Sequence, residues 1–329
     1  MTTRHGRRLR GGLVAAALLA ACAATASAGE VRIVLSSKAR PYVMAFRGAR
    51  AALLDAEHDP TPVMLETLKE DPSSVTEDDT LAYLAIGTEA AEWLQEQGIP
   101  PDRLCYCMVA SPEEHGLTGE DAPLGVSMQI PVAEQFALVA RALPDARSVG
   151  TLYRRDDEQS AASVADARAA LPEGWELHTV AMEDHASAAE AIDALYGAGV
   201  DVVWTAADPS IYTKVLVRAL LLKGLRNGTP VYGFSIPFVR AGALVGAGID
   251  PQTHGAQAGE LLAEALDKSA SDMSDTPSVE SEVGSEAEQS GPVAPAYQTA
   301  VNLAAAKSLD VRLPEEAVRE ADVVVGQDR

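Results

Sequence analysis

Small polar residues stand directly after short apolar runs along this sequence, at points where the strands of an α/β sheet are expected to end. Ligands of open α/β sheets bind beyond the carboxyl ends of the strands, and a helix that starts there points backbone N–H groups toward an anion. Hydroxyl groups at these ends suit a carboxylate. The candidate ligand-binding residues are Ser36, Ser37, Thr88, Ser111, Ser127, Tyr153, Asp208, Ser235 and Asp250.

Two of these candidates are aspartates followed by proline, Asp208 and Asp250. A cap residue before proline is a common helix start, so capping alone explains each aspartate, Asp250 more readily than Asp208. The carboxylate of Asp208 can also pair with the ammonium group of a ligand. Tyr153 can stack on a flat ligand group. The hydroxyls and Asp208 together lead to the hypothesis that the ligand is an amino acid or a similar zwitterion.

Motifs of catalysis are missing from the sequence. The segment Gly233-Phe-Ser235-Ile-Pro237 lacks the last glycine of a G-x-S-x-G nucleophile elbow. The sequence contains neither G-x-x-x-x-G-K-[ST] nor G-x-G-x-x-G, and its six histidines are scattered. We therefore predict no enzyme and assign no catalytic residue, no metal ligand and no cofactor. A serine hydrolase that uses Ser36 or Ser235 is an alternative without a supporting motif.

Composition limits the partners of the chain. Its 329 residues favour two domains or one large one, and its hydrophobic content of 47% is ample for a core. The formal net charge of −22 argues against a nucleic-acid partner, because non-specific nucleic-acid binding needs a basic surface.

The first 28 residues have the pattern of an export signal. A basic segment with four arginines precedes an apolar segment, and Ala26-Ser27-Ala28 fits an A-x-A cleavage site. In the alternative interpretation, residues 1–21 are a lipoprotein signal, because Leu19-Ala-Ala-Cys22 resembles a lipobox, and Cys22 is the lipidated first residue. Both interpretations predict export to the periplasm or another extracytoplasmic location, as a soluble or a lipid-anchored protein.

The other two cysteines, Cys105 and Cys107, alternate within an apolar run that is typical of a buried strand. Their spacing is at the limit for a disulfide, because Cα atoms of residues i and i+2 are about 6.5–7 Å apart in an extended chain. We interpret both as small core residues and not as a redox or metal pair.

Strands and helices are predicted to alternate along the whole chain, which indicates an α/β fold with parallel sheets. The segment 125–153 is central, since a strand, a helix and a second strand follow one another there with short joints. The expected strands are 31–35, 62–66, 83–86, 104–110, 124–128, 149–153, 176–180, 200–205, 231–234 and 242–247. The expected helices are 41–57, 89–97, 132–143, 161–170, 186–196, 208–225, 253–266, 302–309 and 314–321.

Residues 269–291 interrupt this alternation with seven serines, six acidic residues and no basic residue. Such a segment has few apolar side chains to bury, so we expect an acidic, serine-rich insertion that forms a loop or is disordered. An acidic interaction segment is the alternative.

Several short motifs of this chain, taken in order and spacing, resemble the substrate-binding proteins of ABC transporters, in the branch that includes tryptophan and tyrosine binders. The resemblance extends over about residues 30–325 and differs at Ala110-Ser111-Pro112, where the family commonly has Asp before Pro. The motifs are Gly125-Val-Ser127, Val149-Gly-Thr-Leu-Tyr153, Asp208-Pro209, Gly233-Phe-Ser235, Phe238-Val-Arg-Ala-Gly-Ala243, Gly248-Ile-Asp250 with Gly255, Ala300-Val-Asn302, Leu313-Pro314 and Ala321-Asp322.

The resemblance implies a type I periplasmic-binding-protein fold with two α/β lobes, a hinge crossed three times and a small-molecule ligand between the lobes. We expect lobe one to contain residues 29–128 and about 235–255, and lobe two to contain residues 129–234 and about 256–329. The implied partner is an ABC permease that receives the ligand from a monomeric binding protein. A sensory module read by another membrane receptor is the alternative function.

Overall fold

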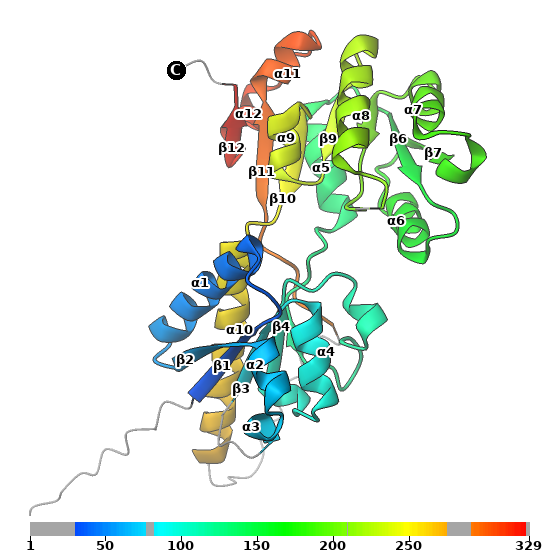
Figure 1. Cartoon of the computed structure of the whole chain (residues 1–329). Coiled ribbons are helices and arrows are strands. Elements are labelled where there is room, and N and C mark those ends of the chain that lie inside the picture. Colours follow the sequence, from blue (N-terminus) through cyan, green and yellow to red (C-terminus); the bar gives the residue numbers. More distant parts are fainter. Residues whose placement is uncertain (1–29, 77–81, 209, 275–290, 327–329) are drawn as a thin grey trace, which may run out of the picture.

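The computed structural model describes residues 30–76, 82–208, 210–274 and 291–326. These residues form two lobes, each built on its own sheet, and three chain segments connect the lobes (Figure 1). The predicted export signal and Cys22 lie outside the described residues.

Lobe one contains a five-stranded parallel sheet in the order β2-β1-β3-β4-β5. Its inner strands consist almost entirely of buried apolar residues, as expected for a sheet covered by helices on both faces. The elements are β1 (Glu30–Leu35), α1 (Arg40–Asp55), β2 (Asp59–Met64), α2 (Leu65–Glu70), α3 (Ser73–Thr76), β3 (Ala82–Ile86), α4 (Thr88–Glu96), η1 (Pro101–Arg103), β4 (Leu104–Cys107), η2 (Pro112–His115), β5 (Leu124–Gly125) and, far along the chain, α10 (Pro251–Ser274).

Lobe two contains a seven-stranded sheet in the order β12-β11-β10-β9-β8-β6-β7. The elements are α5 (Val132–Ala142), β6 (Ser148–Tyr153), α6 (Glu158–Ala169), β7 (Glu176–Ala181), η3 (Met182–Asp184), α7 (Ala188–Gly197), β8 (Val202–Trp204), α8 (Lys214–Asn227), β9 (Val231–Gly233), α9 (Ile236–Ala241), β10 (Val245–Gly248), β11 (Gln298–Asn302), α11 (Leu303–Ser308), α12 (Glu315–Arg319) and β12 (Val323–Val325).

The sheet of lobe two is mixed, so the prediction of a wholly parallel sheet is wrong there. Strand β11 is antiparallel to β10. The reason is the path of the chain, because β10 ends where the chain leaves for lobe one and β11 begins where the chain returns. Neither β11 nor β12 was among the expected strands.

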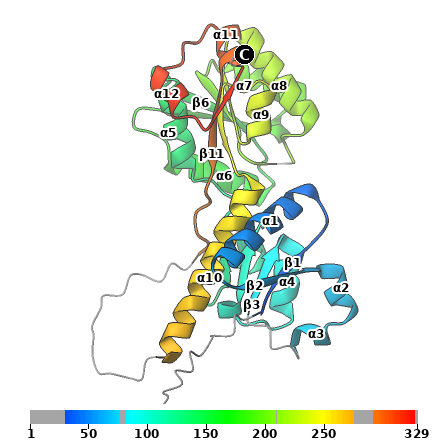
Figure 2. The ribbon, with the colours of Figure 1, turned by 90° about the vertical axis from the view of Figure 1, so that its left-hand side faces the viewer.

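Helix α10 packs lengthwise along α1 in lobe one, as Figure 2 shows. Its buried residues Ala258 and Leu262 belong to the same apolar cluster as Val31 and Ile33 of β1. Strand β10, in contrast, lies between β9 and β11 of lobe two. The expected exchange of segments is therefore wrong: residues 235–250 belong to lobe two, and Pro251–Ser274 belongs to lobe one.

The start of α8 and the end of α10 also differ from the boundaries expected from the sequence. Helix α8 begins at Lys214 and not at Asp208, because the side chain of Thr213 accepts a hydrogen bond from Leu216 N and caps the helix. Residues 269–274 of the expected insertion form the last turns of α10. Residues 275–290 of the insertion lie outside the described residues.

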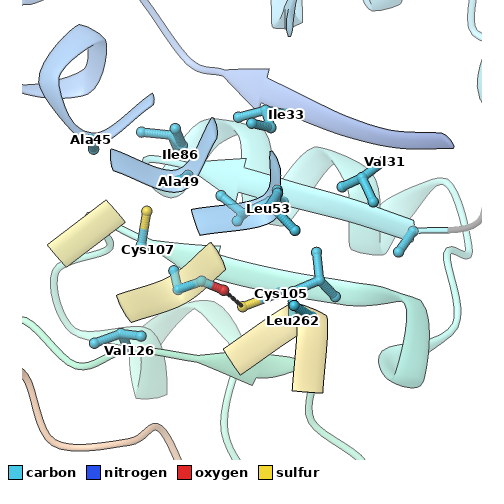
Figure 3. Close-up of a cluster of buried hydrophobic side chains, with 14 of the residues drawn as sticks. Val31, Ile33, Ala45, Ala49, Leu53, Ile86, Cys105, Cys107, Val126 and Leu262 are labelled. Carbon is cyan, nitrogen blue, oxygen red and sulfur yellow. Dashed lines mark hydrogen bonds between the residues drawn. The ribbon is translucent and has the colours of Figure 1, made fainter. Parts of the chain in front are cut away.

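The two cysteines lie in the core of lobe one, next to α10 (Figure 3). Both are free thiols and fully buried, which confirms the prediction of core residues. Cys105 Sγ donates a hydrogen bond to the backbone oxygen of Ala258 at 3.6 Å. Burial raises the pKa of Cys105 to about 12 and raises the pKa of Cys107 well above its ordinary value.

Neither cysteine should react with a thiol reagent in the native protein at pH 8, because the thiolate is the reactive form and both pKa values are raised. We expect less than about 0.1 modified thiol per chain within an hour, and both thiols modified in denaturant. The measurement is mass spectrometry after treatment with iodoacetamide. Fast modification of the folded chain would contradict the buried position of the strand.

His254 lies at the hinge, in the first turn of α10, and is fully buried. Its Nε2–H donates to the backbone oxygen of Ser127 at 3.0 Å, so α10 is tied to the first connecting segment. Its Nδ1 is buried without a partner among the described residues. Burial lowers the pKa of His254, and the hydrogen bond to Ser127 opposes this shift in part.

The lowered pKa of His254 predicts a loss of stability in mild acid. The unfolded chain binds a proton at a histidine pKa of about 6.5, whereas the folded chain resists protonation. The contribution of His254 to the free energy of unfolding is therefore fully present above about pH 6.5. It decreases as the pH falls toward the lowered pKa of His254 in the folded state. Melting temperatures measured from pH 7.5 to pH 5 should fall less steeply for His254→Gln than for the parent. His178→Gln, on a partly exposed histidine, is the control and should change the slope less than His254→Gln does.

Candidate functional site

The carboxyl ends of the strands in the two lobes face each other. In lobe one, β5 ends directly before the segment that leads to lobe two, and β4, β3 and β1 run parallel to it. In lobe two, β10 ends directly before the segment that leads to lobe one, and β9, β8 and β6 run parallel to it. Eight of the nine candidate ligand-binding residues follow these strands and Tyr153 is the last residue of β6, so the topology places them along two opposed edges (Figure 1).

Asp208 follows β8, the strand between β6 and β9 in lobe two. Its Oδ1 accepts hydrogen bonds from Ser210 N at 2.9 Å, from Ser210 Oγ at 2.6 Å and from Ile211 N at 3.3 Å. One carboxylate oxygen thus holds the turn that leads to α8. The other oxygen, Oδ2, is buried and has no hydrogen-bond partner among the described residues.

Arg154 follows β6, the neighbour of β8, and was not among the predicted site residues. Its backbone N–H donates to Ser160 Oγ at 2.9 Å. Its side-chain Nε is buried without a hydrogen-bond partner, and within the described part of the chain no ion pair joins Arg154 to Asp208. The sequence offered no signal for Arg154, because an arginine in the pair Arg154-Arg155 is indistinguishable from a solvent-exposed loop residue.

The next residue, Arg155, has partners of its own. Its guanidinium pairs with Asp184 Oδ2 at 2.7 Å, and its backbone N–H donates to Glu183 Oε2 at 3.2 Å. The hydrogen bond to Arg155 lowers the pKa of Asp184. Arg155 therefore forms a surface ion pair, whereas Arg154 has a buried Nε–H without a hydrogen-bond partner among the described residues.

Aromatic rings lie beside Asp208 at the same edge. Tyr212 and Phe234 have ring centroids 5.8 Å apart, and Phe234 meets Phe238 edge-to-face at 5.4 Å. Tyr212 is buried, whereas Phe234 and the predicted stacking residue Tyr153 keep part of their surface accessible. Phe234 was missed by sequence reasoning, although it occurs within the quoted motif Gly233-Phe-Ser235.

Two of the candidate hydroxyls of lobe one, those of Ser36 and Ser37, have structural partners. Ser36 Oγ accepts a hydrogen bond from Ala90 N at 3.0 Å and so caps α4 from the end of β1. Ser37 Oγ accepts from Ala39 N at 3.3 Å. Thr88 is the first residue of α4 and is partly exposed. The three residues lie together at the ends of β1 and β3, which are adjacent strands.

Ser111 contacts the other lobe directly. Its Oγ accepts a hydrogen bond of 2.6 Å from Nε2 of Gln159, which is in α6 of lobe two. Ser111 is buried and has a left-handed backbone conformation with φ of 49°, which is uncommon for a residue other than glycine. The hydrogen bond joins the two edges in the structure.

The remaining three candidates have capping or hinge positions. Asp250 Oδ1 accepts from Thr253 N at 3.0 Å in the first turn of α10, which confirms its capping role. Ser235 Oγ accepts from Phe238 N at 3.3 Å and caps α9. Ser127 lies in the first connecting segment, where its N–H donates to Val293 O at 2.8 Å.

Within the described ranges, no group of three or more His, Cys, Asp or Glu side chains is arranged to hold a metal ion. Among the helices that the structure describes, none combines the length and the apolar character needed to cross a membrane.

Solved structures with the same fold are numerous, although no curated protein matches the chain. A ligand-free, open substrate-binding protein with adhesive properties from Clostridium difficile is 18% identical, with a TM-score of 0.68, and the match covers 91% of this chain and 100% of that one. An ABC domain from Streptococcus pneumonia in complex with L-Trp is also 18% identical, with a TM-score of 0.57 and the same coverage of both chains. A periplasmic ribose ABC transporter protein from Conexibacter woesei is 14% identical, with a TM-score of 0.51 and coverage of 86% and 95%.

The sequence itself provides the assignment to a family. Residues 85–325 match the family described as ABC transporter substrate binding protein, which is well over half of the chain. The two-lobed fold and the three connections agree with this match. The chain therefore belongs to the family of ABC transporter substrate-binding proteins.

Proposed function

We propose that this substrate-binding protein captures an amino acid or a similar zwitterion between its two lobes and presents it to an ABC permease. The observation that carries the proposal is a pair of opposite charges at one edge of lobe two. Among the described residues, Asp208 has a buried carboxylate oxygen without a hydrogen-bond partner, and Arg154 has a buried N–H without one. Buried polar groups are expected to be satisfied, so each atom calls for a partner, which we propose the bound ligand supplies.

The two charges suit the two ends of a zwitterion. Asp208 would accept from the ammonium group, and Arg154 would donate to the carboxylate, since charge-assisted hydrogen bonds are stronger than neutral ones. Phe234 and Tyr153 would contact the side chain of the ligand. The hydroxyls of Ser36, Ser37, Thr88 and Ser111 in lobe one would complete the site when a hinge motion brings the lobes together, because ligand contacts from both lobes favour the closed state.

A thermal-shift screen tests the ligand class. We would compare L-tryptophan, which the Streptococcus ABC domain binds, with tryptamine and indole-3-propionate, and then test the other amino acids. A ligand present at about 100 times its Kd stabilises the native state by about 2.7 kcal/mol, whereas a compound without ammonium or carboxylate should have little effect. If no amino acid at about 1 mM raises the melting temperature, or if an amine or acid alone acts as strongly, the zwitterion proposal is wrong.

Export and a monomeric state belong to the same proposal. The support for export is the basic and apolar pattern of residues 1–28 or 1–21, and mass determination of the mature chain from cells would distinguish cleavage after Ala28 from lipidation at Cys22.

A further inference from the structure

A groove on lobe two lies between α8, α9 and α11, away from the edge that faces lobe one. Its volume is about 730 Å³, and none of the nine candidate ligand-binding residues lines it. Figure 1 shows α8 and α9 on the surface of lobe two, with α11 near the end of the lobe that is remote from lobe one. The proposed transport function does not use this groove.

The groove is mainly apolar. Helix α8 contributes Val217, Leu221, Leu222 and Leu225, and Leu309 lines the groove after the end of α11. Leu222 and Leu225 remain 45% and 48% exposed. Large apolar side chains that gather around one concave surface indicate a binding site more strongly than scattered ones do.

The charged residues of the groove are all basic. Lys214 and Arg218 of α8 and Arg240 of α9 line it, and no acidic residue does. None of their three side chains forms a hydrogen bond or an ion pair within the described part of the chain. On another face of the same helix, Lys223 pairs with Asp193 at 2.6 Å. The chain has 48 acidic residues and 26 basic ones, so the charge of this lining is opposite in sign to that of the chain as a whole.

We propose that the groove binds an anionic amphiphile with one apolar chain and a carboxylate head, of the fatty-acid type. The apolar chain would cover the leucines of α8, and the carboxylate would meet Arg218 and its basic neighbours, to which it is complementary in charge. The volume lies within the range of about 300–1,000 Å³ that small-molecule sites have. A flat anionic membrane fits less well, because the protein carries a net charge of −22 and the groove is concave.

Calorimetry of the full chain with decanoate, below its micelle concentration, tests the proposal. Decanoate should bind, and n-decyl glucoside, which has the chain without the charge, should bind at least about tenfold more weakly, because it cannot accept charge-assisted hydrogen bonds from the basic side chains. Acetate, which has the charge without the chain, should not bind measurably. The affinity for decanoate should also decrease with added salt.

Matched variants on α8 locate the site. Arg218→Glu should weaken decanoate binding by about tenfold, whereas Arg226→Glu, on an exposed arginine outside the groove, should change it less than about twofold. Leu222→Gln should weaken binding, and Val215→Gln, at a side chain 81% exposed and outside the groove, should not. Asp208→Asn should leave decanoate binding unchanged, which separates this site from the proposed zwitterion site.

Four results of the binding experiments would each overturn the proposal. They are no binding of decanoate at about 1 mM, equal binding of the glucoside, equal weakening by the Arg218 and Arg226 variants, and loss of decanoate binding in Asp208→Asn. Sedimentation provides a further check. A parent dimer that Leu222→Gln dissociates would show that a second copy of the chain covers the groove, and the amphiphile assignment would then be wrong.

Discussion

Replacing Gly255 by alanine is expected to destabilise lobe one by about 3 kcal/mol or more, which corresponds to a fall of roughly 6–12 °C in melting temperature. Gly255 lies on the face of α10 that contacts α1. A methyl group there would overlap the backbone oxygen of Ala45 and lie 2.7 Å from its Cα. Both obstacles are backbone atoms, so relief requires the two helices to move apart and to open the cluster around Ala258 and Leu262.

A graded series of glycine variants supplies the controls for this prediction. Gly259→Ala should be milder, since its methyl group would stand 2.8 Å from the oxygen of Ala49. Gly197→Ala, at the exposed end of α7 with nothing within 4 Å, should be neutral or stabilising by up to about 1 kcal/mol. The measurement is thermal unfolding followed by circular dichroism. A melting temperature of Gly255→Ala within about 2 °C of the parent would contradict the close packing of α1 and α10.

Replacing Asp208 by asparagine should reduce the affinity for the zwitterion found in the thermal-shift screen by about 2–5 kcal/mol, which is about 30- to 4,000-fold in Kd. Asparagine can still accept the hydrogen bonds of Ser210 and Ile211 through its side-chain oxygen, so the turn should persist. The loss comes from the ammonium group, which would be left without its anionic partner. The measurement is calorimetry of the variant and the parent, with melting temperature as the test of folding.

Asp250→Asn is the matched control for the Asp208 variant. Asp250 also follows a strand and precedes a proline, but it caps α10, and asparagine caps a helix about as well as aspartate. Affinity and stability should therefore stay close to those of the parent. An Asp208→Asn affinity within about twofold of the parent would leave Asp208 with its role in the turn alone and would remove the ammonium contact from the proposed site.

The sequence indicated the position of the candidate site more clearly than the residues that form it. Polar residues after apolar runs identified the two facing edges, because strand ends are local features of the sequence. The same pattern included Ser36, Ser235 and Asp250, whose side chains cap helices in the structure. It omitted Arg154, since only the fold shows that its Nε is buried without a partner among the described residues, after a strand that neighbours β8.

The sequence by itself determined the α/β class, the positions of most elements and the family, because these depend on local periodicity and on motif order. Only the tertiary structure decided that α10 belongs to lobe one and that β11 runs antiparallel to β10. Periodicity identifies the buried face of α10, but a face with Gly255, Ala258 and Leu262 could pack in either lobe. The lobe in which α10 packs depends on a matching surface of glycine and alanine on α1. Helix α1 lies about 200 residues earlier in the chain, so a local sequence pattern does not reveal this match.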